Sequence, residues 1–210
     1  MLHQKMTDRP WSAWPLVAVS LNPIKGWQPD YYGFCDLCIV RQEPGGAREV
    51  VLDCRVRAMP LKGDALRCLG EFTAAETVRF DLVGWGYQRV ARDLPDVLQA
   101  VAFGCKDALP VAVNPKLCRR LLHRAVRVNE GMGHHLNKSG VFILREKSRW
   151  IDLGLWKVGT SQSFSGLRVS PAERVTEALD ALPLLANTLG AHPDWSVSQL
   201  FDWQERLPPF

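Results

Sequence analysis

Residues 15–22 read PLVAVSLN: a proline opens a short apolar run, which ends at the polar residues Ser20 and Asn22. An apolar run of this length, rich in β-branched residues and followed by polar ones, predicts a buried β-strand. Small polar side chains at the end of such a strand can face a site. Two questions follow: which strands flank this one, and whether Ser20 and Asn22 belong to a site.

Two more strands are predicted directly after this one. Residues 33–42, GFCDLCIVRQ, and residues 48–59, REVVLDCRVRAM, are rich in valine, isoleucine, leucine and cysteine. Pro44, Gly45 and Gly46 separate them and predict a turn. Strands joined by a tight turn pair antiparallel, so the first part of the chain predicts an antiparallel meander of three strands.

The rest of the chain alternates between helices and strands. Asn114 followed by Pro115 predicts a helix start, with asparagine as the cap and proline in the first turn. Residues 170–173, SPAE, form a capping box that opens a long amphipathic helix, which Gly190 closes and Pro183 is expected to kink. In chain order we expect helices over 72–80 and 87–103, a strand over 110–114, a helix over 116–128, strands over 140–146 and 149–158, and helices over 170–189 and 196–207.

This order predicts an α/β fold with a mixed sheet. Three antiparallel strands followed by alternating helices and strands are similar to the ribonuclease H-like order. We expect an N-terminal arm over 1–14, the ribonuclease H-like domain over 15–191, and a helical tail over 192–210 that packs on the domain. A length of 210 residues with 47% hydrophobic residues suits one domain with a buried core.

Composition bears on the compartment and on metal binding. No run of about 18 apolar residues is present, and the N-terminal residues lack an apolar core of signal-peptide length. We therefore expect a cytoplasmic protein without membrane contact.

Of the six cysteines, Cys35 and Cys38 form a CxxC pattern. On a strand their side chains point to opposite faces, so we expect buried free thiols and no structural zinc.

The chain resembles the DEDD-type 3′–5′ exonucleases over roughly residues 15–190. In that family the first strand ends in Asp-x-Glu, and here Ser20 and Asn22 occupy those positions. A further metal-binding aspartate of the family falls near Cys118. The histidine that precedes the family's last aspartate by five residues falls at Val175. The remaining family aspartates match Asp152 in RWIDLGL and Asp180 in EALDAL.

The resemblance implies a degenerate site made of Ser20, Asn22, Cys118, Asp152 and Asp180. Two-metal phosphodiester cleavage holds two Mg²⁺ ions between hard oxygen ligands, mostly carboxylates. Two carboxylates with a serine, an asparagine and a thiol would hold such a pair poorly. We therefore expect no catalysis, no bound metal and no cofactor. The alternative is an active Mg²⁺-dependent nuclease with a non-standard carboxylate site, in which Asp53 and Asp81 join Asp152.

The predicted helix over 116–128 carries a basic face. Leu117, Leu121, Leu122 and Ala125 form its opposite, buried side. The helix contains no acid, so its basic face suits the phosphates of a DNA or RNA backbone. A solvated face, an acidic lipid and a protein partner are the alternatives. With the glycine-flanked loop GMGHHLNKSG (131–140), the expected nucleic-acid-binding residues are Lys116, Arg119, Arg120, His123, Arg124, Arg127 and Lys138.

These observations favour a nucleic-acid-binding, catalytically inactive exonuclease-like subunit of a larger DNA- or RNA-processing complex, with protein partners. The net charge of +4 permits such a partner. One alternative is a protein-interaction subunit without nucleic-acid contact, which would use some of the eight tryptophans. Another is a ferredoxin-like RNA-binding module with GMGHHLNKSG as its glycine loop, although the three-strand start fits that fold poorly.

Overall fold

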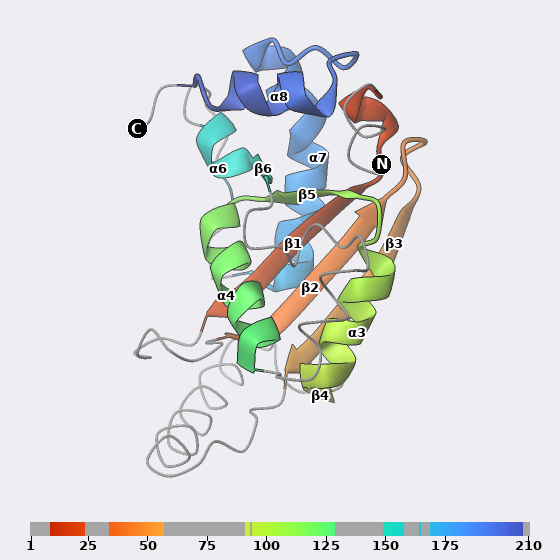
Figure 1. The fold of residues 1–210 in the computed structure, drawn as a ribbon, viewed down its shortest axis with the longest axis vertical. Helices are drawn as coiled ribbons and strands as arrows, with labels where there is room; N and C mark the ends of the chain where they lie inside the picture. Colours follow the sequence, from red (N-terminus) through yellow and green to blue (C-terminus); the bar gives the residue numbers. More distant parts are fainter. Residues whose placement is uncertain are drawn as a thin grey trace.

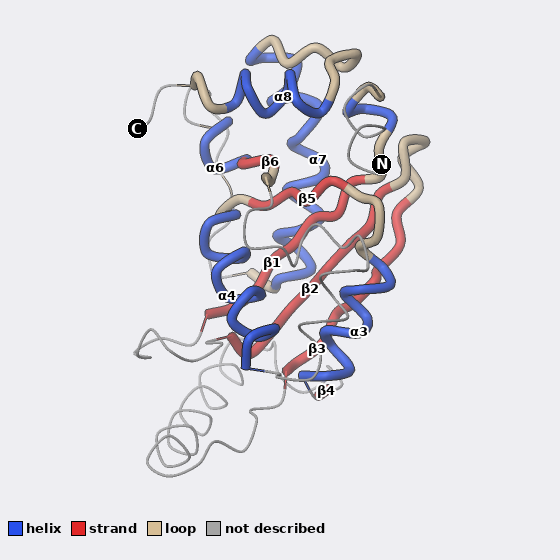
Figure 2. The backbone as a smooth tube through the Cα atoms, in the orientation of Figure 1, coloured by secondary structure: helices blue, strands red, loops and turns tan. Residues whose placement is uncertain are grey.

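The computed structural model describes residues 9–23, 34–56, 91–92, 94–128, 149–157, 164 and 169–207. In this part of the chain a mixed sheet is covered by helices on both faces (Figures 1 and 2). The α/β class predicted from the sequence is confirmed. The helix expected over 72–80, the strand expected over 140–146, Asp81 and Lys138 lie outside the described residues.

The sheet has six strands in the order β4-β3-β2-β1-β5-β6. The three strands of the first part pair antiparallel, and β5 and β6 continue the sheet parallel to β1 on its other side. β4 is a short edge strand parallel to β3. The strands are β1 (Leu16–Pro23), β2 (Phe34–Gln42), β3 (Arg48–Val56), β4 (Ala91–Arg92), β5 (Leu109–Ala112) and β6 (Ile151–Asp152).

The helices divide between the two faces of the sheet. Helices α3 and α4 cover one face, and α7 crosses the other, where it packs on β1 and β2 (Figure 1). A 3-10 turn and two shorter helices complete the α7 side. The elements are η1 (Trp11–Ala13), α3 (Leu94–Gly104), α4 (Pro115–Val128), α6 (Leu153–Trp156), α7 (Pro171–Leu189) and α8 (Val197–Gln204).

Alternation along β1 divides the buried side chains into two cores. Val17, Val19 and Leu21 belong to the core under α3 and α4. Leu16 and Ala18 belong to the core under α7. Because successive strand residues point to opposite faces, Ser20 and Asn22 are directed to the α7 face. Each side of the sheet is therefore an apolar layer, and the polar end of β1 faces α7.

Several predicted helix ends are confirmed at atomic detail. Ser170 and Glu173 form the expected capping box of α7, and Gly190 ends this helix in the left-handed conformation with φ of 75°. The side chain of Asn114 accepts a hydrogen bond from the backbone N–H of Leu117 at 3.1 Å, as expected for the cap of α4. The helix α7 continues through Pro183, which lies inside its bounds.

Two predicted elements were wrong in part. The helix expected over 87–103 begins only at Leu94, and Ala91–Arg92 form the edge strand β4. Proline lacks an N–H and clashes in a helix interior, so a helix containing Pro95 is favoured to begin just before it. The strand expected over 149–158 stops after Asp152, because the Asp152 side chain caps α6 by accepting the Leu155 N–H at 3.0 Å.

Segments from the two ends of the described chain are bonded together. The backbone N–H of Trp11 donates to the carbonyl of Trp195 at 2.8 Å, and its indole N–H donates to the carbonyl of His192 at 2.9 Å. Both Trp11 and Trp14 are buried in the α7-side core. The arm and the tail expected from the sequence thus share one core with the sheet and α7.

The side chain of Gln204 joins α8 to the edge strand β6. Its amide oxygen accepts the backbone N–H of Asp152 and the indole N–H of Trp156, both at 2.9 Å. Its amide nitrogen donates to the carbonyl of Trp150 at 3.0 Å. These contacts satisfy polar groups at a sheet edge that would otherwise be buried without partners.

The cysteines of the described region are buried and are not in disulfides: Cys38, Cys54, Cys105 and Cys118. The Cys35 side chain lies outside the described residues. None of the helices that the structure describes is long and apolar enough to cross a membrane.

Candidate functional site

Three parallel strands end at one edge of the sheet. Ala18 of β1 pairs with Val111 of β5, and Ala112 of β5 pairs with Asp152 of β6. After β1 the chain continues into β2, which lies on one side of β1 in the sheet. On the other side of β1 lies β5, which is followed by α4 and then β6. In α/β sheets, ligand sites form outside the carboxyl ends of the strands where the strand order reverses. The carboxyl end of β1 is thus the candidate site.

A buried arginine from α7 occupies the end of β1. The Nε of Arg174 donates to Ser20 Oγ at 2.8 Å, and Nη2 donates to Asn22 Oδ1 at 2.5 Å. Further hydrogen bonds at 3.3 Å join the guanidinium to the carbonyls of Leu21 and Val169. Only 8% of Arg174 is exposed. The guanidinium therefore holds together the end of β1 and the start of α7.

The network extends to one carboxylate on β2. Asn22 pairs with Asp36 in the strand register, and its amide nitrogen donates to Asp36 Oδ2 at 3.2 Å. Both residues are buried, with 4% and 3% of their surface exposed. Asn22 therefore bridges the cation of Arg174 and the carboxylate of Asp36. We call Ser20, Asn22, Asp36 and Arg174 the Arg174 cluster.

Cys118 on α4 lies within electrostatic reach of this cluster. Burial raises the pKa of its thiol to about 12, and the positive charge of Arg174 opposes that rise without overcoming it. A thiol must lose its proton to bind a metal. Burial thus favours the protonated thiol of Cys118, and a thiol is in any case a poor ligand for a hard cation such as Mg²⁺.

Asp152 lies at the end of β6 and caps the helix that follows it. Its carboxylate caps α6, while its backbone N–H is bonded to Gln204. Burial raises the pKa of Asp152, and the backbone N–H groups of Leu155 and Gly154 oppose the shift. Gly154 fits only as glycine, because an added Cβ would lie 2.2 Å from the carbonyl oxygen of Val113. These side-chain contacts of Asp152 are those of a helix cap.

Asp180 lies apart from the cluster, near the opposite end of the sheet. Its exposed carboxylate pairs with Arg48 at 2.7 Å. Arg48 lies opposite Gln42, which in turn lies opposite Leu16, the first residue of β1. Helix α7 starts beside the carboxyl end of β1 and leads away from it, so six residues beyond Arg174 the chain has left the site. The structure thus groups Ser20 and Asn22 with Arg174, not with Asp180.

Sequence reasoning missed Arg174 and Asp36. Arg174 shares the buried side of α7 with residues such as Ala178, Leu182 and Leu185. A charged residue on the apolar stripe of a helix was the available signal, because such a charge needs a buried partner. Within the described residues, no group of three or more histidine, cysteine, aspartate or glutamate side chains is placed to hold a metal ion.

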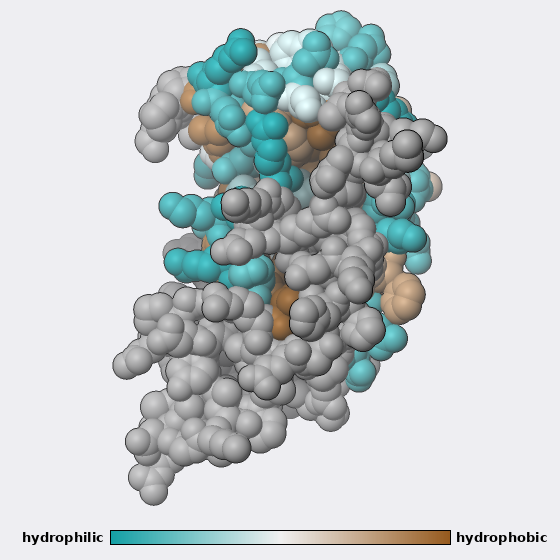
Figure 3. Space-filling model, viewed as in Figure 1, coloured by the Kyte–Doolittle hydropathy of each residue, from teal (hydrophilic) through white to brown (hydrophobic). Residues whose placement is uncertain are grey.

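The basic helix is confirmed as α4, with the expected orientation. Leu121, Leu122 and Ala125 are buried, Lys116 and Arg120 are exposed, and Arg119 and His123 are half-buried. The side chains of Arg124 and Arg127 lie outside the described residues. In Figure 3 hydrophilic side chains project from the left flank of the molecule, where α4 lies. This helix packs on the face of the sheet opposite α7.

Comparison with known proteins does not identify a family for this chain. A scan against models of protein families gave no match, and a search of curated proteins gave none.

Proposed function

We propose that this chain is a nucleic-acid-binding protein with a ribonuclease H-like fold and a catalytically inactive exonuclease-like site, and that it works as a subunit of a larger DNA- or RNA-processing complex. The strand order supports the fold. Three antiparallel strands are followed by β5 and β6, which run parallel to β1 and are connected through α4. This arrangement supports a ribonuclease H-like sheet, to which β4 adds a short edge strand parallel to β3.

The main observation in support of an inactive site is that Arg174 donates hydrogen bonds to both Ser20 and Asn22. In the exonucleases that the chain resembles, acids at these two positions bind catalytic metal. Here the side chains are neutral, and a permanently charged guanidinium already bonds to them. A divalent ion at this place would be repelled by Arg174 at close range. The proposal is therefore that Arg174 supplies a cation at the place where the resembled enzymes bind metal.

The basic face of α4 supports nucleic-acid binding. Lys116 and Arg120 are exposed one turn apart on the same side of the helix. Lysine and arginine side chains in such a row can contact successive phosphates and release their counterions. Binding through this face would be largely independent of base sequence.

A nuclease assay tests the inactive site. Single-stranded DNA and RNA incubated with the protein and Mg²⁺ or Mn²⁺ should remain intact. Asp152→Asn and Asp36→Asn serve as comparison variants, because each retains a side-chain oxygen acceptor and removes the charge. Metal-dependent cleavage that either variant abolishes would contradict the proposal and favour the active-nuclease alternative.

A binding assay tests the α4 face. The double variant Lys116→Gln/Arg120→Gln should bind a generic oligonucleotide more weakly, and its salt slope should fall by about 1.5 units, since each phosphate contact contributes about 0.7–0.9. The double variant Lys106→Gln/Arg206→Gln removes the same charge from exposed positions outside α4 and should bind like the wild type. Equal affinity of all three folded proteins would favour the protein-interaction alternative.

A further inference from the structure

We propose that the carboxyl end of β1 is a binding site for a guanidinium cation, which the native chain fills with its own Arg174. The acceptors of this site come from two parts of the chain that are distant in the sequence: Ser20, Leu21 and Asn22 on β1, and Val169 just before α7. A variant without the arginine side chain should therefore take up a free guanidinium compound from solution. The inference rests on the proposed function, which assigns the cation of Arg174 to this place.

The acceptors engage all three nitrogen atoms of the guanidinium. Nε donates to Ser20 Oγ at 2.8 Å, and Nη1 donates to the carbonyl of Val169 at 3.3 Å. Nη2 donates to Asn22 Oδ1 at 2.5 Å and to the carbonyl of Leu21 at 3.3 Å. A guanidinium is planar and carries its N–H donors in fixed directions, whereas an ammonium is a compact charge with three donors. The site should therefore discriminate between these two kinds of cation.

The same network contains a buried negative charge. The amide nitrogen of Asn22 donates to Asp36 Oδ2 at 3.2 Å, and only 3% of Asp36 is exposed. Two buried charges of opposite sign compensate each other for the loss of water, and removing one of them is costly for the other. Without the cation of Arg174, this end of β1 keeps a carboxylate and several oxygen acceptors, which together attract a cation.

Burial distinguishes Arg174 from a surface arginine with similar bonds. Only 8% of Arg174 is exposed, so truncation of its side chain leaves space inside the protein that a molecule of matching shape can fill. The guanidinium of Arg149 also donates to two carboxylates, those of Asp202 and Glu205, but 41% of its side chain is exposed. Water replaces that side chain, so Arg149→Ala should create no such site.

The probe is N-ethylguanidinium, which has the heavy atoms that Arg174→Ala removes beyond Cβ. We expect Arg174→Ala, in the full chain, to melt below the wild type and to gain thermal stability with the probe in a saturable way. Circular dichroism measures the midpoint, with sodium chloride holding the ionic strength constant. At about ten times the dissociation constant the midpoint should rise by about 3–6 °C, as ligand linkage and the melting entropy of a chain of this size require.

Other cations and other variants provide the controls. Ethylammonium carries the same charge on the same stem, and Mg²⁺ is a hard cation, and both should raise the midpoint of Arg174→Ala much less. Arg174→Met fills the space without a charge, so it should melt below the wild type and gain nothing from the probe. Arg149→Ala and the wild type should lose slightly, because guanidinium compounds are weak denaturants at low concentration.

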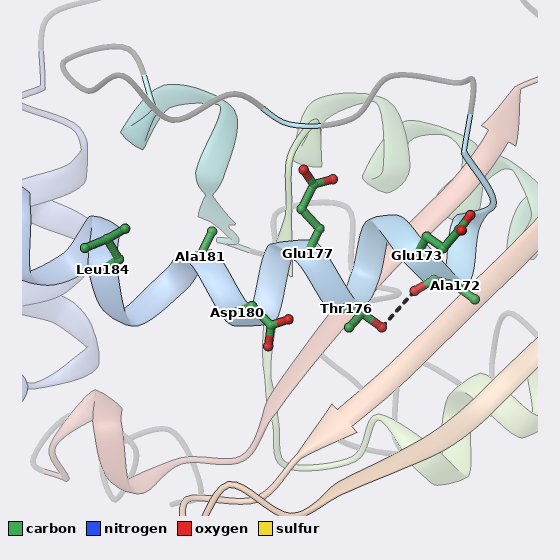
Figure 4. Close-up of a pocket in the computed structure, with 7 residues that line it drawn as sticks. All are labelled: Ala172, Glu173, Thr176, Glu177, Asp180, Ala181 and Leu184. Carbon is green, nitrogen blue, oxygen red and sulfur yellow. Dashed lines mark hydrogen bonds between the residues drawn. The ribbon is translucent and has the colours of Figure 1, made fainter.

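Thr176→Ala is the control on the same helix. Figure 4 shows Thr176 among the residues that line a surface pocket on α7, where its hydroxyl donates to the Ala172 carbonyl at 3.0 Å. Arg174 is not one of these lining residues. Thr176→Ala therefore leaves the guanidinium site intact and should respond to the probe like the wild type.

Each contrary result would overturn the inference. An unchanged midpoint of Arg174→Ala with the probe would show that no site remains, and an equal rise with ethylammonium or Mg²⁺ would show that any cation suffices. Wild-type stability of Arg174→Met would show that this place needs no cation. If Arg174→Ala does not fold alone, the probe is titrated during refolding from urea, and a variant that stays unfolded at every probe concentration would also overturn the inference.

Failure of this inference and failure of the proposed function give different results. Metal-dependent cleavage by the wild type, together with a guanidinium-specific rise in Arg174→Ala, would contradict only the inactive site. Intact DNA and RNA without such a rise would contradict only the guanidinium site.

Discussion

Arg174 donates hydrogen bonds to four groups around the candidate site, on Ser20, Leu21, Asn22 and Val169. We predict that Arg174→Gln lowers the free energy of unfolding by about 2–3 kcal/mol, because it removes charge-assisted hydrogen bonds and leaves buried acceptors unsatisfied. Urea denaturation measures this change. Thr176→Ala on the exposed side of the same helix should change it by less than about 0.5 kcal/mol. Arg174→Lys should recover little, since one ammonium cannot reproduce the planar fork. Full stability of Arg174→Gln would show that the network is dispensable.

Cys118 provides a second test at this scale. Its pKa of about 12, raised by burial, keeps the thiol protonated well above neutral pH. Since the thiolate is the reactive form, we predict that Cys118 resists alkylation by iodoacetamide at pH 8 in the folded protein and reacts readily in urea. Mass spectrometry of the Cys118 peptide measures both rates. Rapid labelling of the native protein at this residue would contradict the burial described here.

Among the elements, α8 is joined to the sheet edge by the buried side chain of Gln204 and by exposed ion pairs of Arg149 with Asp202 and Glu205. We predict that Gln204→Ala lowers the free energy of unfolding by about 1–3 kcal/mol, because Asp152, Trp150 and Trp156 each lose a buried hydrogen-bond partner. Hydrogen exchange at the Asp152 amide should accelerate. Gln99→Ala, at an exposed position of α3, should leave both measurements unchanged. Equal exchange at Asp152 in the two variants would mean that α8 is held in another way.

Local patterns predicted most elements, and tertiary contacts account for the errors. The strands expected over 15–22, 33–42 and 48–59 correspond to β1, β2 and β3, and the caps of α4 and α7 are where the sequence placed them. These features depend on neighbouring residues alone. The strand predicted over 149–158 is longer than the observed β6, because the end of β6 is set by the Asp152 cap and by the close approach of Gly154 to Val113, just after β5.

The candidate site was less predictable than the fold for the same reason. Ser20 and Asn22 were identified from the end of one strand. Their partner Arg174 is more than 150 residues away in the chain, and a single sequence gives no spacing rule for such a contact. The sequence analysis placed Asp180 in the site because it matches an aspartate of the resembled family. In the structure, the direction of α7 places Asp180 away from the carboxyl end of β1.

At the scale of the whole molecule, the core under α7 is closed by the contact between Trp11 and the segment that contains His192 and Trp195. Trp11 is buried and bonded to both His192 and Trp195. We predict that Trp11→Ala lowers the free energy of unfolding by about 3–5 kcal/mol and reduces hydrogen-exchange protection in α8. Trp11→Phe should retain most of the stability, since it keeps an aromatic ring and loses one hydrogen bond. Unchanged hydrogen-exchange protection of α8 in Trp11→Ala would show that the stability of α8 does not depend on Trp11.

The two cores also differ in when they can form during synthesis. The core under α3 and α4 draws its residues from Val17 to Val126, with Trp150 as the last member. The core under α7 includes Trp11 but also Leu200 and Phe201. A chain that leaves the ribosome from its N-terminus can therefore assemble the first layer while the second still lacks its closing helix. Until α7 emerges, the side of β1 on which it packs is exposed to chaperones and to other nascent chains, and Trp11 lacks its hydrogen-bond partners until His192 and Trp195 follow.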